Sequence, residues 1–330
     1  MPDIAQPTES SLAGRSVLVT GGAGFIGSHV VDRLLDAGCR VTVIDNFDPF
    51  YEPAVKEANL APHLADRRFR LVRCDIRDRE TLRRELGGEE YAAVVHLAAK
   101  AGVRPSIVDP VAYQEVNVQG TQNLLELARE RGIGRFVFAS SSSVYGVNPR
   151  LPWREDDFVL QPISPYAATK VAGELLGHVY HHLYGLRFVA LRFFTVYGPR
   201  QRPDLAIHKF ARLIRDGRSI PIYGDGTTRR DYTYVDDAVE AVLRALDYEG
   251  GGYEVINVGN HETVELRELV RMLAGELGRE ARCEFLPPQP GDVPATWADT
   301  AKAERLLGFR PRTPFREGLR RFVAWFQGRG

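Results

Sequence analysis

Thr20-Gly21-Gly22-Ala23-Gly24-Phe25-Ile26-Gly27 is the most informative segment of this 330-residue chain. A short apolar run, 16–20, precedes it, and apolar residues then recur with helical spacing over 26–34. A second apolar run follows at 40–45, so the region predicts a strand, a helix and a second strand. Glycines at such a junction let the backbone turn tightly and approach a pyrophosphate at the helix N-terminus. The stretch therefore predicts a dinucleotide-binding turn, although an isolated glycine triplet is often only a tight turn.

Asp45 ends the second predicted strand, at the distance from the glycine turn where a carboxylate accepts hydrogen bonds from both ribose hydroxyls. Because a carboxylate there repels a 2′-phosphate, NAD is favoured over NADP as the cofactor. The alternative for Asp45 is a turn residue at a strand end. Segments 75–76 and 96–99 follow the next two strands and are placed to line the adenine and the pyrophosphate. The predicted cofactor-binding residues are Gly21, Gly24, Phe25, Ile26, Gly27, Asp45, Asn46, Asp75, Ile76, Leu97, Ala98 and Ala99.

The rhythm of strand and helix continues along the first two thirds of the chain. Strand-like runs at 69–72, 91–97, 135–140 and 186–191 alternate with helical patterns at 79–86, 116–131 and 167–184. This alternation predicts an α/β fold with a doubly wound parallel sheet of the Rossmann type. After about residue 197 the elements become shorter, with amphipathic helices at 264–277 and near 315–326, which indicates a smaller mixed α/β part for substrate. The expected division is a flexible segment 1–14, an NAD-binding domain 15–196 and a mainly substrate-binding domain 197–330, with crossings of the chain between the two domains allowed.

Composition excludes several classes of partner. Lys+Arg and Asp+Glu both total 43, so no overall field attracts nucleic acid or an anionic membrane, and an anionic ligand must be held by local groups. The N-terminal stretch lacks the basic flank and apolar core of a signal peptide, and no apolar run approaches the length of a membrane span. A cytoplasmic protein is expected, with Cys39, Cys74 and Cys283 as buried, reduced thiols.

Tyr166 and Lys170 stand four residues apart in the helical pattern 167–184 and its preceding turn, so both side chains leave the same face. Ser141, Ser142 and Ser143 follow the strand at 135–140. Taken separately, the Tyr and Lys can be a solvated helix face and the serines simple turn residues. Their order along the chain, glycine turn, serine, tyrosine and lysine, favours a functional interpretation of these residues over the structural one.

With this order the chain resembles the extended short-chain dehydrogenase/reductase superfamily and its NAD-dependent epimerase/dehydratase family, from about residue 16 to residue 326. The resemblance implies that Tyr166 is the acid/base and that Lys170 contacts the nicotinamide ribose and lowers the pKa of the tyrosine. It also implies that Ser141 hydrogen-bonds the reacting hydroxyl. The chemistry agrees, because a phenol with its ordinary pKa near ~10 needs positive charge nearby to act as a base at neutral pH.

The residues after the catalytic serine indicate the type of reaction. Dehydratases and decarboxylases of this superfamily resemble one another in having an acidic residue there, whereas this chain has Ser142 and Ser143, which are assigned to substrate binding. The resemblance therefore favours 4-epimerisation: a 4-keto sugar turns over and takes its hydrogen back on the opposite face. Because the hydride is returned to the sugar, the reaction consumes no NAD, and NAD is therefore predicted to stay bound.

Three segments resemble the UDP-glucuronate 4-epimerases: 193–202, 100–104 and 289–294. In those enzymes the residues matching Thr195 and Arg202 hold the sugar carboxylate, which suits the planar fork of a guanidinium. The alternative for Arg202 is a surface arginine, and for Arg104, the other expected substrate ligand, a structural ion pair. By the same resemblance Arg230 contacts the diphosphate, and Gln289 and Asp292 contact the UDP ribose. The predicted reaction interconverts UDP-glucuronate and UDP-galacturonate.

Two kinds of alternative stay open. Within the enzymes, the chain can be a UDP-glucose/UDP-galactose or dTDP-sugar 4-epimerase; outside them, it can be an NAD-sensing binding module, against which Ser141, Tyr166 and Lys170 argue. Asp236-Asp237 is interpreted as a pair of carboxylates opening a helix, not as a metal site, and no metal is predicted. Relatives pair through a helical bundle, so the resemblance implies a homodimer.

Overall fold

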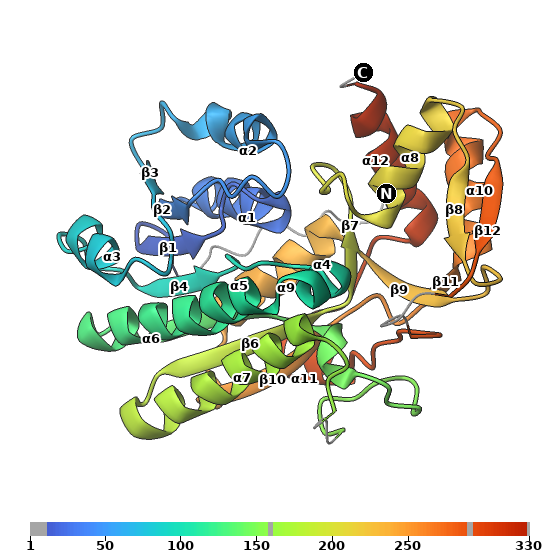
Figure 1. Ribbon diagram of the computed structural model, residues 1–330. Helices are drawn as coiled ribbons and strands as arrows, with labels where there is room; N and C mark the ends of the chain where they lie inside the picture. The colour runs from blue at the N-terminus through green and yellow to red at the C-terminus, as the bar shows by residue number, and fades with distance from the viewer. Residues whose placement is uncertain (1–11, 158–160, 289–292, 329–330) are drawn as a thin grey trace, which may run out of the picture.

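A seven-stranded parallel sheet forms the centre of the protein (Figure 1). The computed structural model describes residues 12–157, 161–288 and 293–328. The strand order is β10-β6-β5-β4-β1-β2-β3, so it changes direction between β1 and β4, where parallel sheets leave a crevice at their carboxyl edge. The strands are β1 (Ser16–Thr20), β2 (Arg40–Asp45), β3 (Phe69–Arg73), β4 (Ala93–His96), β5 (Arg135–Ser141), β6 (Arg187–Phe193) and β10 (Tyr253–Val258).

Helices cover both faces of this sheet, and its central strands β1 and β4 are buried and mostly apolar for that reason. All five residues of β1 are buried; Val17 and Val19 belong to one core and Leu18 to the other. On the first face lie α1 (Phe25–Asp36) and α9 (Val235–Asp247), and on the second lie α3 (Arg79–Glu85), α6 (Gly120–Glu130) and α7 (Pro165–Tyr184) (Figure 1). The prediction of a doubly wound parallel α/β sheet is confirmed.

Smaller elements complete the molecule beside this sheet. A three-stranded sheet has the order β11-β9-β7, a separate pair joins β8 to β12, and α10 packs against α8 and α12. These elements are β7 (Thr195–Tyr197), α8 (Ala206–Arg215), β8 (Ile220–Tyr223), β9 (Arg229–Tyr234), β11 (Thr263–Glu265), α10 (Leu266–Leu277), β12 (Cys283–Leu286), α11 (Ala301–Leu307) and α12 (Phe315–Gln327). The remaining helices are α2 (Pro53–Leu60), α4 (Val103–Val108), α5 (Pro110–Gln114) and three single turns, Ala61–His63, Glu115–Gln119 and Ser142–Tyr145.

The large sheet and its first face contain elements from both predicted domains, and the division at residue 196 stays a prediction. Strand β10 and helix α9 come from the region 197–330 yet join the large sheet and its first face. The end of the segment expected to be flexible is packed: Leu12 is buried, and its carbonyl oxygen accepts a hydrogen bond from the Cys39 thiol at 3.4 Å. Residues 1–11 of that segment lie outside the described residues.

The cysteine prediction is correct for two of three residues. Cys39 and Cys74 are free and buried, but Cys283 is free and exposed. Strand β12 carries Cys283 and pairs only with β8 among the described strands, so most of its side chains face solvent. Asp236 and Asp237 do open α9, in its first turn, as the helix-dipole interpretation predicts. In the described part of the chain, no helix is long and apolar enough to cross a membrane.

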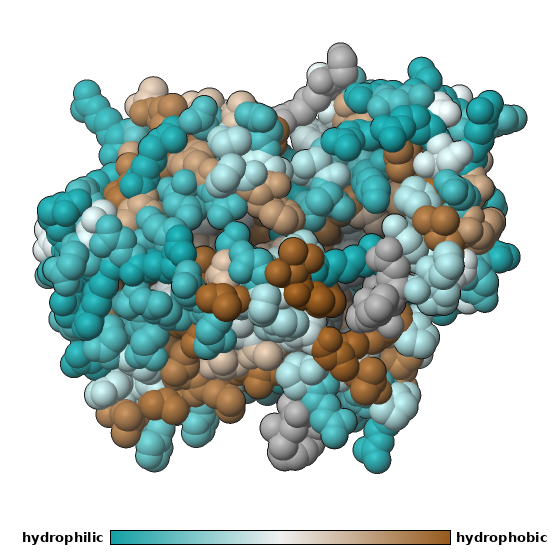
Figure 2. Space-filling model, viewed as in Figure 1, coloured by the Kyte–Doolittle hydropathy of each residue, from teal (hydrophilic) through white to brown (hydrophobic). Residues whose placement is uncertain are grey.

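Helix α7 exposes an apolar stripe. Leu175, Val179 and Leu183 repeat at four-residue spacing on its outer face, and all three are exposed. Figure 2 shows hydrophobic side chains gathered along the edge of the molecule over α7. The opposite face of the same helix packs on the sheet, because Gly173 and Gly177 allow Phe138 and Phe188 to approach its backbone.

Candidate active site

One cavity of about 1030 Å³ lies at the carboxyl edge of the large sheet and extends to β7 and β9. All of the predicted site residues within the described part of the chain line it, although they come from separate segments. They are Gly21, Gly24, Phe25, Ile26, Gly27, Asp45, Asn46, Asp75, Ile76, Leu97, Ala98, Ala99, Arg104, Ser141, Ser142, Ser143, Tyr166, Lys170, Thr195, Arg202 and Arg230. Gln289 and Asp292 lie outside the described residues.

Close contacts require glycine at two positions of the turn between β1 and α1. Gly21 has φ +71°, and a Cβ built on it meets the Ala98 nitrogen at 2.7 Å. A Cβ on Gly27 meets the Gly21 carbonyl oxygen at 2.1 Å. Any side chain at either position therefore displaces backbone. Gly24 is the N-cap of α1, so the unpaired N–H groups of the first helical turn face the cavity, where they suit an anion.

Asp45 ties the glycine turn to the end of β2. Its Oδ2 accepts from the Ala23 N–H at 3.0 Å and its Oδ1 accepts from the Phe47 N–H at 2.9 Å. Burial raises the pKa of Asp45, and these backbone hydrogen bonds oppose the shift. A carboxylate has about four lone-pair sites, so each oxygen can accept another hydrogen bond. Asp45 thus serves the turn, as its alternative interpretation held, and still presents acceptors to the cavity.

A buried histidine holds the strand ends that flank the glycine turn. Thr20 donates through its hydroxyl to Nδ1 of His96 at 2.7 Å, and Nε2 of His96 lies 2.9 Å from the hydroxyl of Thr121. That hydroxyl donates to the carbonyl of Asn117, which makes it an acceptor toward His96. Burial lowers the pKa of His96 to about 3, so the imidazole is neutral. The Ala98 N–H then donates to Thr20 at 3.2 Å, which fixes the turn after β4.

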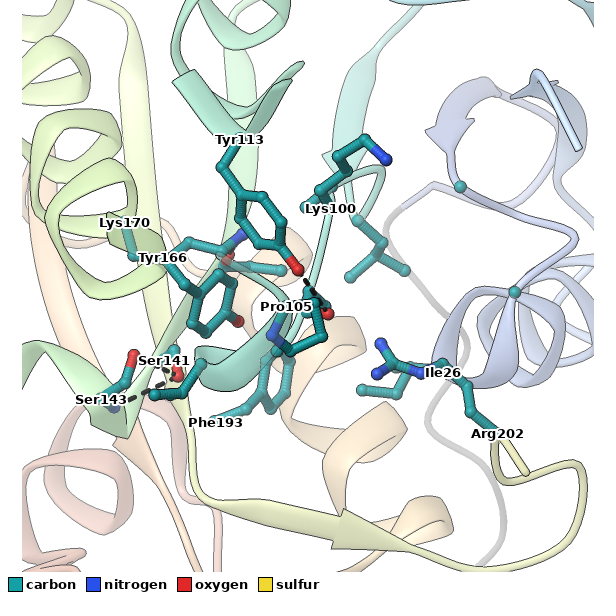
Figure 3. A pocket seen from close by; sticks show the side chains of 18 of the residues that line it. Ile26, Lys100, Pro105, Tyr113, Ser141, Ser143, Tyr166, Lys170, Phe193 and Arg202 are labelled. Carbon is teal, nitrogen blue, oxygen red and sulfur yellow. Dashed lines mark hydrogen bonds between the residues drawn. The ribbon is translucent and has the colours of Figure 1, made fainter. Parts of the chain in front are cut away.

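Tyr166 and Lys170 occupy the start of α7. Ser164 caps this helix by accepting from the Ala167 N–H, and Pro165 starts its first turn, as such a sequence favours. The Lys170 ammonium donates to the Ala139 carbonyl oxygen at 2.7 Å and lies 5.8 Å from the centre of the Tyr166 ring. In Figure 3 the ring of Tyr166 lies between Lys170 and the two serines Ser141 and Ser143.

The pKa of Tyr166 is governed mainly by burial. Burial raises it, and a side-chain hydrogen bond with Ser141 and the positive charge of Arg202 only partly oppose the shift. The Lys170 ammonium donates to the Ala139 carbonyl oxygen, and its expected lowering of the tyrosine pKa stays a prediction. Burial also lowers the pKa of Lys170 to about 8, opposed by the charge of Glu174.

The serines after β5 form a local network. The hydroxyl of Ser141 accepts from the N–H of Ser143 at 3.2 Å and from its hydroxyl at 3.0 Å. Ser142 and Ser143 begin a single helical turn and also line the cavity. Three hydroxyls therefore converge next to Tyr166, without a carboxylate among them.

Three arginines also line the cavity. Arg202 is 17% exposed and pairs with Asp204, so its interpretation as a surface arginine is wrong. Arg104 stacks on the Tyr223 ring at 5.0 Å, and Arg230 on β9 donates to the Arg229 carbonyl at 2.9 Å. Thr195 begins β7 and lines the same cavity as Arg202.

Sequence reasoning missed two polar residues that line the cavity, Tyr113 and Lys56, and a third, Asn117, that supports its wall through Lys100. Asn117 lies in a π-helical turn where a regular α-helix was expected, and its amide bonds both the N–H and the carbonyl of Lys100, at 2.8 and 2.9 Å. Tyr113 donates to the Ala101 carbonyl and packs its ring edge-on against Tyr166. Lys56 is buried in α2 and donates to the Asp48 carbonyl at 2.7 Å. The buried face that Lys56 shares with Asn59 and Leu60 was the available signal.

This combination defines a dinucleotide-dependent enzyme of the short-chain dehydrogenase/reductase kind: a doubly wound sheet, a glycine turn at its crevice, a carboxylate after β2, and serine, tyrosine and lysine in the same cavity. Residues 17–259 match the family described as NAD dependent epimerase/dehydratase family. The chain belongs to that family. It is an isomerase, a nucleotide-sugar 4-epimerase, and NAD is its cofactor.

Individual relatives extend over nearly the whole chain. A UDP-glucuronate 4-epimerase of Thermodesulfobacterium geofontis is 42% identical over 93% of this chain and 95% of its own. The crystal structure of UDP-glucuronic acid 4-epimerase from Bacillus cereus, in complex with UDP-glucuronic acid and NAD, is 37% identical with a TM-score of 0.89, covering 96% of this chain and 100% of its own. A UDP-glucose 4-epimerase from Thermotoga maritima, with UDP-glucose, is 35% identical with a TM-score of 0.88, covering 95% and 99%.

Among the described residues, no group of three or more His, Cys, Asp or Glu side chains is arranged to hold a metal ion. The absence of a metal from the reaction stays a prediction.

Proposed function

We propose that this enzyme inverts C4 of UDP-glucuronate to give UDP-galacturonate. The observation that carries the proposal is the guanidinium of Arg202, which lines the same cavity as Tyr166 and is close enough for its charge to lower the pKa of that phenol (Figure 3). A sugar whose C4 hydroxyl meets Tyr166 places its C5 substituent nearby. A guanidinium there suits a carboxylate better than a neutral hydroxymethyl group.

The relatives support the same substrate without excluding a neutral one. The Thermodesulfobacterium and Bacillus proteins are named for UDP-glucuronate, whereas the Thermotoga protein, at a similar TM-score, is named for UDP-glucose. A UDP-glucose or dTDP-sugar 4-epimerase is therefore the second candidate. Arg202 and Thr195 are the residues whose chemistry separates the two.

The chain's own groups provide the acid/base chemistry. In the proposed mechanism Tyr166 takes the proton of the C4 hydroxyl and returns it after inversion, while Ser141 hydrogen-bonds the same oxygen. Bound NAD supplies the hydride acceptor and donor, and its positive nicotinamide lowers the pKa of a nearby phenol. The ammonium group of Lys170 lies near the Tyr166 ring, and we assign to it the hydrogen bond with the nicotinamide ribose.

Ser142 and Ser143 are proposed to contact the substrate and, by lacking an acid, to leave the ketone intact. No carboxylate stands at these positions to assist elimination. The simplest fate of the C4 ketone is then rotation of the sugar and reduction from its other face. The proposed substrate ligands on the nucleotide side are Arg104, Arg230, Gln289 and Asp292.

Holding the carboxylate protects the intermediate. A 4-keto uronic acid is a β-keto acid, which loses carbon dioxide when its carboxylate stands perpendicular to the ketone plane. Arg202 and Thr195, which line the same cavity, can fix the angle of that carboxylate and suppress the loss. Arg202 and Thr195 thus serve substrate specificity and also protect the keto intermediate from decarboxylation.

Replacement of Arg202 by Leu tests the proposal. Binding of UDP-glucuronate is expected to weaken by ~1.5 to 3 kcal/mol, roughly ten- to a hundredfold, because a charge-assisted contact is lost. UDP-glucose affinity is expected to change little, and NMR is expected to show some decarboxylated pentose product. Arg212→Leu, an exposed change on α8, is the matched control. Unchanged affinity of Arg202→Leu for UDP-glucuronate would remove the basis of the substrate assignment.

A further inference from the structure

Arg202 does not stand alone at the cavity wall, because its guanidinium forms a two-point ion pair with Asp204. The Nε of Arg202 donates to Oδ1 of Asp204 at 3.0 Å, and Nη2 donates to Oδ2 at 2.7 Å. This side-on arrangement uses one edge of the guanidinium and takes no hydrogen bond from Nη1. The Arg202 side chain reaches into the cavity (Figure 3), whereas Asp204 is not among the lining residues and is 37% exposed at the rim.

A short turn creates this geometry. The Leu205 N–H donates to the Arg202 carbonyl at 3.2 Å, which closes a turn with Pro203 and Asp204 in its middle positions. Proline fixes φ at the first of these positions, as such turns favour. The turn brings the carboxylate two residues ahead back to the guanidinium. On its other side, Arg202 stacks over the Phe50 ring at 5.3 Å.

The loop that carries the pair is anchored at three further points. Nε2 of His29 lies 2.9 Å from the Pro199 carbonyl, and Arg200 pairs with Asp32 at 2.8 Å; both partners belong to α1. Nδ1 of His208 lies 2.6 Å from the Gln201 carbonyl. With the backbone fixed, the remaining freedom is that of the long Arg202 side chain, which the carboxylate of Asp204 removes.

We propose that Asp204 is a positioning residue for substrate specificity: it holds the Nε–Nη2 edge of Arg202 so that the Nη1 end is presented to the carboxylate of the sugar. The inference rests on the proposed function, since it needs Arg202 to be the carboxylate ligand. The negative charge of Asp204 also has an opposite effect on substrate binding, because a carboxylate at the rim repels an anionic substrate. Repulsion, however, acts on every nucleotide diphosphate sugar, while positioning of Arg202 acts only on sugars that carry a carboxylate.

Asp204→Ala tests the proposal by titration with UDP-glucuronate and with UDP-glucose. An immobilised, rotamer-rich side chain costs binding when it is released, so Kd for UDP-glucuronate is expected to rise about three- to tenfold. Kd for UDP-glucose is expected to stay the same or fall. Asp204→Asn keeps the shape and one acceptor, so it is expected to lie between the parent and the alanine variant. Asp216→Ala, which breaks another exposed arginine–aspartate pair of neighbouring residues, is the matched control.

A double variant separates positioning from a general structural effect. In the Arg202→Leu background, Asp204→Ala is expected to cause no further weakening of UDP-glucuronate binding, because the arginine that it positions is gone. Equal or tighter binding of UDP-glucuronate by Asp204→Ala alone would overturn the inference, as would equal weakening for both sugars. If Arg202→Leu itself binds UDP-glucuronate normally, the proposed function fails; if only Asp204→Ala does, the inference alone fails.

Discussion

At the scale of single residues, the site depends on groups that burial makes difficult to charge. Burial raises the pKa of Tyr166 and lowers that of Lys170 to about 8. Both shifts disfavour the phenolate and ammonium forms that acid/base chemistry needs. The hydrogen bond from Ser141 and the charge of Arg202 act against the shift at Tyr166. We infer that bound cofactor completes the electrostatics of the site.

Tyr166→Phe is the residue-scale test of the acid/base assignment. The variant keeps the ring and its packing but removes the hydroxyl, so kcat is expected to fall at least ~10²-fold while the cofactor remains bound. Steady-state kinetics and the absorbance of released nicotinamide dinucleotide measure the two parts. Tyr248→Phe, outside the cavity, serves as the control. Near-normal turnover of Tyr166→Phe would transfer the proton-transfer role to another group, with Ser141 examined first.

Residue positions were more predictable than residue partners. The predicted site residues came from turns after parallel strands, and such turns meet at one edge of a sheet, which explains why the described ones share a cavity. The Asp204 partner of Arg202 and the orientation of Lys170 toward Ala139 depend on side-chain rotamers, which no spacing rule specifies. Lys56 escaped notice because a buried lysine is rare and α2 is short.

At the scale of elements, one buried carboxylate on β9 connects this strand to the loops that contain Asn260 and Ala298. Asp231 on β9 accepts from the Asn260 N–H at 2.7 Å and from the Ala298 N–H at 3.2 Å, and its side chain is fully buried. Burial raises its pKa from 3.8 to about 7, with the backbone hydrogen bonds opposing the shift. Arg230, its neighbour, lines the cavity, so Asp231 joins the substrate wall to the rest of the fold.

This carboxylate predicts a pH dependence of stability. The folded pKa lies above the unfolded one, so the folded state binds the proton more tightly between about 4 and 7. The stabilisation is complete below the unfolded pKa and is lost as pH rises through about 7. The free energy of unfolding is measured with urea at pH 5 and at pH 8. From pH 5 to pH 8 this free energy is expected to fall more in the parent than in Asp231→Asn. The exposed change Asp216→Asn is expected to keep the parental dependence; an equal dependence in Asp231→Asn would contradict the assignment.

Element types followed from local patterns, and element partners did not. The strands of the first half were expected within a few residues of their positions, because alternating apolar runs and helical periods are local features. Strand β10 was not identified, since its place beside β6 depends on pairing across more than fifty residues. The π-helical turn at Glu115–Gln119 was also missed, because one different hydrogen bond leaves the hydrophobic period almost unchanged.

At the scale of the whole molecule, the cavity joins the two parts of the chain. Its wall includes residues of the large sheet's carboxyl edge and residues of β7 and β9. The division at residue 196 is proposed as a functional one, with α9 and β10 returning to the nucleotide-binding part. The balanced composition predicts that local groups hold an anionic substrate, and Arg104, Arg202 and Arg230 line the cavity. A cytoplasmic location stays a prediction.

The exposed stripe on α7 predicts a homodimer. Leu175, Val179 and Leu183 present an apolar face suited to the same face of a second copy, which agrees with the helical pairing that the family resemblance implies. Sedimentation at micromolar concentration is expected to give a dimer for the parent and a monomer for the double change Leu175→Glu, Val179→Glu. Leu64→Glu is the control, since Leu64 is 62% exposed and Leu175 is 61% exposed. A monomeric parent protein would refute the proposed dimer.

Product analysis by NMR tests the central claim, C4 inversion of UDP-glucuronate, most directly. The purified enzyme is incubated separately with UDP-glucuronate and with UDP-glucose, and the products are identified from the coupling of the C4 proton. We expect UDP-galacturonate from the first, much slower conversion of the second, and no net consumption of NAD, because the hydride is returned to the sugar. Inversion of UDP-glucose in preference to UDP-glucuronate would contradict the substrate assignment, and stoichiometric reduction of added NAD would contradict epimerisation.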